Sequence, residues 1–101
     1  MAGKKKLWSI LTDDLSRCYV TGSNCVAIHH VFPGVGRRSI CEKYGFIVPL
    51  SPWLHNMSNE SVHSNPNTGL DLKLKQECQA YYEAHYGSRK EFVLTFGKSY
   101  L

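Results

Sequence analysis

Four of the five histidines in this 101-residue chain lie between positions 29 and 63, and this clustering is the strongest constraint on its fold and chemistry. The adjacent pair His29 and His30 lies in the run Ala-Ile-His-His-Val-Phe, and His55 and His63 follow. Imidazole ligates metals and transfers protons near neutral pH. Clustered histidines beside arginines therefore point to metal-assisted attack on an anionic substrate, for which a phosphodiester is the natural candidate.

The residues before and within the histidine pair predict a β-hairpin. Residues 17–21 and 25–31 contain several β-branched and aromatic side chains, which favour strands. The Thr-Gly-Ser-Asn sequence at 21–24 lies between them and is a turn signal. We therefore expect a hairpin whose second strand carries His29 and His30.

The segment after the pair predicts a loop, a strand and the start of a helix. Residues 33–38 are too rich in glycine for a regular element, so they predict a loop. Residues 45–50 predict a short strand with Pro49 at a sheet edge. A hydroxyl cap at Ser51 and a proline after it predict a helix that opens at Trp53 and holds His55 in its first turns.

The last third of the chain predicts two helices. A largely apolar stripe predicts a helix that Thr68 caps and Gly87 ends. A capping box at residues 88–91 opens a second helix that Gly97 stops. Both helices are expected to be scaffold, with His85 packed or on the surface rather than a ligand. The stripe consists of Leu70, Leu74, Cys78, Tyr81 and His85, and the aromatic residues expected in the core are Trp53, Tyr81, Tyr82, Phe92 and Phe96.

Length, charge and cysteine content limit the class of protein. The chain predicts a single domain over residues 1–101, in which residues 1–6, with their three lysines, form a flexible basic end. Its net charge of +4 is typical of small domains that meet nucleic-acid phosphates. None of the four cysteines has zinc-knuckle spacing, and no secretory or membrane-spanning segment is evident, so free thiols in a reducing cytoplasm are expected.

Several separated motifs resemble one nuclease family. They are Cys18-Tyr19-Val20-Thr21-Gly22, His29-His30-Val31-Phe32, Glu42-Lys43-Tyr44-Gly45, Val48-Pro49-Leu50, His55-Asn56-Met57-Ser58-Asn59, Val62-His63 and Phe96-Gly97-Lys98-Ser99-Tyr100-Leu101. In this order they resemble the HNH or ββα-metal endonucleases, and in particular the phage RecA-dependent, Ref-like recombination-enhancement nucleases. The resemblance implies an α+β fold, with a ββα-metal core on a short antiparallel hairpin and two packed C-terminal helices. It also implies divalent-metal-dependent cleavage of DNA.

The resemblance implies a role for each histidine of the cluster. His30 would be the general base that takes a proton from the attacking water, and His29 would help to hold the metal. His55 is the best match for a helical ligand, with His63 or Asn59 completing the set. Asn59 follows His55 by four residues on the same helical face, whereas His63 follows by eight and needs the chain to turn back or the helix to persist. The implied metal is Mg²⁺ or Mn²⁺, with Zn²⁺ as an alternative in crystals.

The resemblance also implies partners. Arg37 and Arg38, in the glycine-rich loop beside the pair, are expected to hold the scissile or a flanking phosphate. DNA would be the substrate, in the host cytoplasm if a bacteriophage encodes the chain, and the activity would be linked to phage recombination. A RecA-type recombinase filament is a further partner that the family implies.

Three features depart from the family pattern. Strict alternation along a strand puts His29 and His30 on opposite faces, so both serve one site only if the strand ends or bulges there. Phe46 occupies the position of the family's middle asparagine, so another group or a backbone carbonyl has to orient the base. A structural zinc is expected to be absent, because three of its expected ligand positions hold Thr21, Ser51 and Leu54.

Two other functions stay open at this point. A DNA-binding recombination accessory module on the same fold, without cleavage, is slightly favoured by the missing asparagine. The complete histidine set argues for an enzyme instead, because a module that does not cleave has no need of an imidazole cluster. A small metal-stabilised adaptor would bind another protein and would have no affinity for polyanions.

Overall fold

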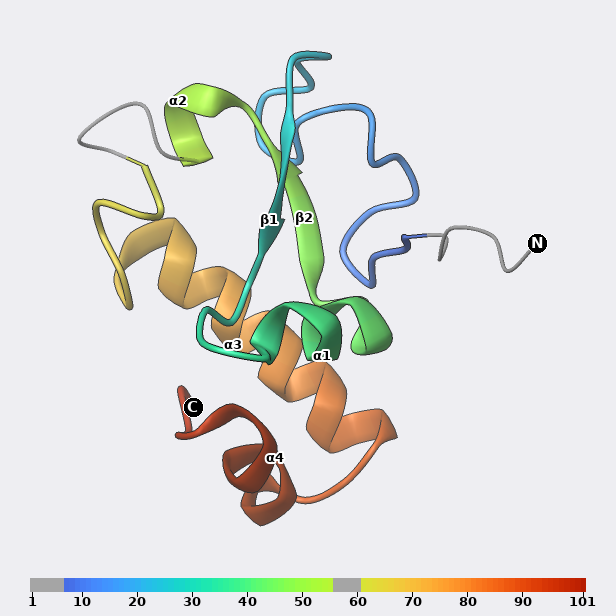
Figure 1. The fold of residues 1–101 in the computed structure, drawn as a ribbon, viewed down its shortest axis with the longest axis vertical. Coiled ribbons are helices and arrows are strands. Elements are labelled where there is room, and N and C mark those ends of the chain that lie inside the picture. Colours follow the sequence, from blue (N-terminus) through green and yellow to red (C-terminus); the bar gives the residue numbers. More distant parts are fainter. Residues whose placement is uncertain (1–6, 56–60) are drawn as a thin grey trace.

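The structure is a computed structural model that describes residues 7–55 and 61–101, and its α+β architecture is shown in Figure 1. A two-stranded antiparallel sheet has α2 at one end and α1 at the other, and α3 and α4 follow (Figure 1). Among the described residues, no helix combines the length and apolar character needed to cross a membrane. The elements in order are β1 (Ala27–His30), α1 (Arg37–Tyr44), β2 (Ile47–Leu50), α2 (Pro52–His55), α3 (Gly69–His85) and α4 (Arg89–Phe96).

The sheet pairs β1 with β2, and its register positions the histidine pair. His29 lies opposite Val48, and His30 lies opposite Ile47. All four residues of β2 are buried, as expected for a short strand rich in branched apolar side chains. The strand predicted over residues 45–50 is therefore confirmed for residues 47–50.

The hairpin predicted between residues 17–21 and 25–31 is wrong, because the first of these segments is a tight turn. The Gly22 N–H donates to the Cys18 carbonyl at 2.9 Å, and the Cys18 N–H donates to the Ser23 carbonyl at 2.7 Å. The Thr21 N–H also points at the Cys18 sulfur, at 3.5 Å. Local turn bonds thus override the β propensity of these side chains, and β1 takes a partner from further along the chain.

Helix α1 occupies part of the segment that was expected to be a loop. Gly36 and Gly45 bracket the helix, and both adopt the left-handed conformation, with φ of 77° and 74°. The Gly45 N–H caps the helix by donating to the Cys41 carbonyl. The loop prediction for residues 33–38 is therefore wrong at its end, since Arg37 and Arg38 form the first turn of this helix.

The helices predicted after Ser51, Thr68 and Ser88 are confirmed, although α3 ends at His85 with Tyr86 as its cap, before Gly87. The N–H groups of Leu54 and His55 both donate to the Ser51 carbonyl, at 3.0 and 2.9 Å, so α2 begins where predicted. Helix α3 begins after Thr68, although the Thr68 side chain makes no capping bond. Helix α4 has both bonds of the capping box between Ser88 and Glu91, and it ends at Gly97.

Aromatic rings from distant parts of the chain build the core. The Phe32 ring lies 5.8 Å from that of Phe46, 5.5 Å from that of Phe92 and 4.6 Å from that of Phe96. These contacts join the segment after β1 to α4 and to the residue just before β2, and they hold the histidine-bearing strand in place. Trp53 was expected in the core, but this residue is 60% exposed to solvent. His85 is exposed at the end of α3, as expected.

Candidate metal centre

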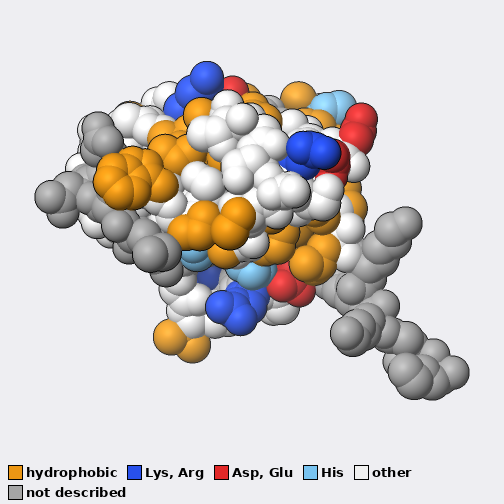
Figure 2. All heavy atoms as spheres, turned by 90° about the horizontal axis from the view of Figure 1, so that it is seen from above, with side chains coloured by type: hydrophobic (Ala, Val, Ile, Leu, Met, Phe, Trp, Pro, Cys, Tyr) orange, Lys and Arg blue, Asp and Glu red, His pale blue; other side chains and the backbone are white. Residues whose placement is uncertain are grey.

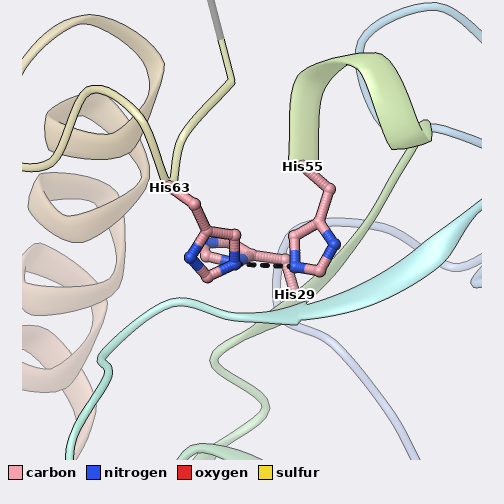
Figure 3. A group of neighbouring side chains, drawn as sticks. All are labelled: His29, His55 and His63. Carbon is pink, nitrogen blue, oxygen red and sulfur yellow. Dashed lines mark hydrogen bonds between the residues drawn. The ribbon is translucent and has the colours of Figure 1, made fainter. Parts of the chain in front are cut away.

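Three histidines converge from three separate parts of the fold. His29 comes from β1, His55 is the last residue of α2, and His63 lies in the segment before α3 (Figure 3). One ligand nitrogen from each ring lies within 4.8 Å of the other two. The Nε2 atoms of His55 and His63 are 2.9 Å apart, and the His29 ring centre lies 5.3 Å from each of their ring centres. The structure thus brings together three of the four predicted ligands.

The backbone explains how His63 reaches a site that begins at His55. The Val62 N–H donates to the Leu54 carbonyl at 2.7 Å, and the His63 N–H donates to the His55 carbonyl at 3.3 Å. The chain therefore turns back onto α2, which was one of the two routes that the spacing left open. Asn59, the fourth predicted ligand, lies outside the described residues, as does Asn56.

The surroundings of His29 and His55 favour the neutral form of both imidazoles. His29 is only 4% exposed, and its Nε2 atom has no hydrogen-bond partner in the part of the chain that the structure describes. Burial, and then the rings of His55 and His63, lower the pKa of His29 to about 3. Burial also lowers the pKa of His55, followed by the effect of His63. Neutral imidazole is the form that ligates metals, so the lowered pKa values of His29 and His55 favour binding of a cation.

The chemistry of the donor set fits a first-row transition metal. A buried nitrogen that lacks a partner costs free energy, and a metal ion would satisfy it. Three imidazoles suit Zn²⁺ and its neighbours in the periodic table, whereas Mg²⁺ prefers oxygen ligands. Three protein ligands also leave an open coordination position, which is typical of catalytic rather than structural zinc sites.

His30 lies beside the triad and contacts an acidic side chain. Its Nε2 atom is 2.8 Å from Oε2 of Glu42, which comes from α1. His29 and His30 line the same pocket of about 280 Å³, together with His55, His63 and Arg38. Strand β1 ends at His30, so the alternation of a regular strand stops there, and the two neighbouring histidines reach one site.

Arg37 and Arg38 occupy different surroundings, and only Arg38 lines the pocket. Arg38 is exposed and lines the pocket, where its guanidinium can meet an anion. Arg37 does not line it, because its Nη1 atom donates a 2.5 Å hydrogen bond to the Phe96 carbonyl at the end of α4. The expectation that both arginines hold phosphate is therefore corrected for Arg37, whose side chain joins α1 to α4.

Two further side chains near the cluster were not singled out from the sequence. Glu42 falls within a motif of the resemblance, but nothing in its spacing pairs it with His30. Asp71 is buried on α3, with one carboxylate oxygen 4.0 Å from Nε2 of His29 and the other 2.8 Å from the Lys75 ammonium. The four-residue spacing of Asp71 and Lys75 predicts their ion pair, but not its position beside a histidine.

Comparison with known proteins assigns no function to the site. No protein-family model, curated protein or solved structure matches the chain. On the face of the molecule shown in Figure 2, histidine side chains reach the surface beside basic and acidic ones, whereas much of the remaining face is apolar or uncharged. The arrangement can bind one metal ion through three imidazoles, present a fourth imidazole beside it and offer a guanidinium to an anion.

Proposed function

We propose that this chain is a metal-dependent endonuclease that hydrolyses phosphodiester bonds of DNA at the pocket of His29, His55 and His63. The observation that carries the proposal is the convergence of these three ligand nitrogens within 4.8 Å, in a pocket that His30 and Arg38 also line. The resemblance to phage HNH nucleases agrees with this arrangement, since it assigns His29 to the metal and His30 to the water. A link to phage recombination, with a recombinase filament as partner, belongs to the same proposal.

His29, His55 and His63 would hold the metal, and the donor set favours Zn²⁺ or a similar late first-row ion over Mg²⁺ and Mn²⁺. When bound, such an ion supplies positive charge that stabilises the oxygens of the phosphate as negative charge develops on them. The buried position of His29 fixes one ligand rigidly, while the exposed His63 leaves the site open on one side.

The remaining residues of the pocket supply the proton transfer and the phosphate contact. His30 takes a proton from a water molecule as the oxygen of that water bonds to phosphorus. The bond to the 3′ oxygen breaks, and this oxygen leaves with the electron pair and takes a proton from solvent. Arg38 donates to a non-bridging or flanking phosphate oxygen, which orients the strand. The net charge of +4 favours DNA over neutral or cationic substrates.

Nicking of supercoiled plasmid by the purified protein tests the proposal. The reaction is run with Zn²⁺, Mn²⁺ and Mg²⁺ in turn, beside an EDTA control, and zinc binding is measured in parallel by calorimetry. His30→Ala should lower the rate by about 10²–10⁴-fold and leave zinc binding intact. His63→Ala should weaken both zinc binding and cleavage. His85→Ala is the matched control, because this exposed histidine stacks on Tyr81 and does not line the pocket.

Two outcomes would contradict the proposal. Absence of cleavage with every metal, on duplex and single-stranded DNA and with a recombinase filament added, would favour the DNA-binding accessory module. Cleavage that His30→Ala and His63→Ala leave unchanged would show that the activity belongs to another site or to a contaminant.

A further inference from the structure

The contact between His30 and Glu42 joins two elements that are separate in sequence. The two residues are 12 positions apart, one at the end of β1 and the other in the last turn of α1. Their side chains are 18% and 22% exposed, so both are largely removed from solvent. A carboxylate held 2.8 Å from an imidazole in this setting is fixed by the fold and is more than a chance surface encounter.

The direction of this hydrogen bond follows from the two groups. An ionised carboxylate can only accept, so the proton must lie on Nε2 of His30. A neutral imidazole carries one proton, and its other nitrogen then has a lone pair. Contact with Glu42 therefore leaves Nδ1 as the nitrogen that can take a proton from water. A ring with the opposite tautomer would lose both the contact and the basic Nδ1.

Helix α1 is anchored at two points, so Glu42 is held firmly. The Cys41 thiol, next to Glu42, is fully buried and donates to the Phe32 carbonyl at 3.5 Å. At the start of the helix, Arg37 is bonded to the Phe96 carbonyl. These contacts tie α1 to the aromatic core and to α4, which restricts the movement of the carboxylate relative to β1.

We propose that Glu42 is a positioning residue that fixes His30 in the Nε2–H tautomer and in the orientation that general-base chemistry requires. The inference rests on the proposed nuclease function of the same pocket. Its physical logic also includes a cost, since a carboxylate beside a phosphate-binding pocket repels the substrate. A role in orienting His30, the general base, explains why a carboxylate that repels DNA lies at this position.

The first measurement does not depend on cleavage. Long-range ¹H–¹⁵N correlation spectra of the zinc-loaded protein report which ring nitrogen of His30 carries the proton, at about pH 8, where an ordinary imidazole is neutral. His30→Ala assigns the signals. We expect the Nε2–H form in the wild type and a mixture of tautomers in Glu42→Ala. Glu42→Gln should retain the Nε2–H form in part, because its amide oxygen can still accept.

The second measurement separates positioning from folding and from charge. Glu42→Ala should lower kcat for plasmid nicking by about 10–100-fold, as is usual for a residue that orients a site from outside it. KM should stay the same or fall, because the repulsive charge is gone, and zinc affinity should not change. Glu42→Gln should recover part of kcat. Glu83→Gln is the control, since it makes the same charge change on α3, where the carboxylate pairs with Arg89.

The outcomes distinguish this inference from the proposed function. An Nδ1–H tautomer in the wild type would overturn the inference, as would Nε2–H retained in full by Glu42→Ala, or an unchanged kcat in that variant. If the wild type cuts no DNA, the nuclease proposal fails, and the tautomer spectra still decide whether Glu42 sets the state of His30.

Discussion

The burial of His29 predicts a pH-dependent stability that a single substitution removes. In the unfolded chain this imidazole has its ordinary pKa of 6.5, whereas in the folded protein burial and the neighbouring histidines lower the pKa to about 3. Between these values the unfolded state binds a proton that the metal-free native state excludes. The stabilising contribution of neutral His29 is therefore complete above pH 6.5, and it is lost as the pH falls from 6.5 toward 3.

The magnitude follows from the difference between the two pKa values. At about pH 5 the solution is 1.5 pH units below the unfolded pKa, and each unit corresponds to about 1.4 kcal/mol. The metal-free protein should therefore lose about 2 kcal/mol of unfolding free energy on this account between about pH 7.5 and pH 5. Burial and His63 also lower the pKa of His55, so His55 adds to the loss in the same direction.

Urea unfolding in the presence of a chelator, followed by circular dichroism, measures this loss. His29→Leu removes the titrating group from this buried position. Over the same pH range the variant should therefore lose about 2 kcal/mol less unfolding free energy than the wild type loses. Titrating groups far from His29 contribute equally to both proteins and cancel in the difference. His85→Ala should follow the wild type, because this histidine is exposed. Parallel curves for the wild type and His29→Leu would refute the reasoning.

Three other predictions concern the metal, a glycine and the displaced arginine. Zinc at about 100 times its Kd should stabilise the protein by about 2.7 kcal/mol, and calorimetric scans should show that EDTA or His63→Ala abolishes the rise in Tm. Gly45→Ala should cost about 2–4 kcal/mol in urea unfolding, because its φ is 74° and a Cβ would lie 2.7 Å from the Trp8 ring. Gly22→Ala, with a φ of 77° but no atom within 4 Å, should cost only the backbone strain. Arg37→Met should lower the unfolding free energy by about 1–3 kcal/mol through loss of its bond to a carbonyl, while zinc titration shows unchanged affinity.

Local sequence signals predicted most of the helices and strands, but they did not predict the partner of β1 or the helix α1. The α4 helix follows from its capping box, and α2 follows from Ser51 and Pro52, because these signals act within a few residues. The partner of β1 was wrong because strand pairing depends on contacts that the local sequence does not encode. Helix α1 was missed because glycines bracket it on both sides, and a glycine-rich stretch predicts a loop.

Some features of the candidate site could likewise be predicted from the sequence, and others depend on the packing of the fold. The histidine cluster was predicted by residue type, since few side chains other than imidazole combine metal ligation with proton transfer near neutral pH. The roles of Glu42, Arg37 and Arg38 all depend on α1, so the loop predicted over residues 33–38 could not indicate them. Burial of the Nε2 atom of His29 is a property of packing, and no sequence pattern reports it.

The bond from Arg37 to the end of α4 has a consequence for genetics. Helix α1 carries the carboxylate that contacts His30, and this bond anchors the helix to a part of the chain far from the histidines in sequence. A screen for inactive variants should therefore recover substitutions at Gly97, where an added Cβ would lie 3.2 Å from the Arg37 guanidinium, as well as at the pocket. Second-site suppressors of such variants should map to the first turn of α1.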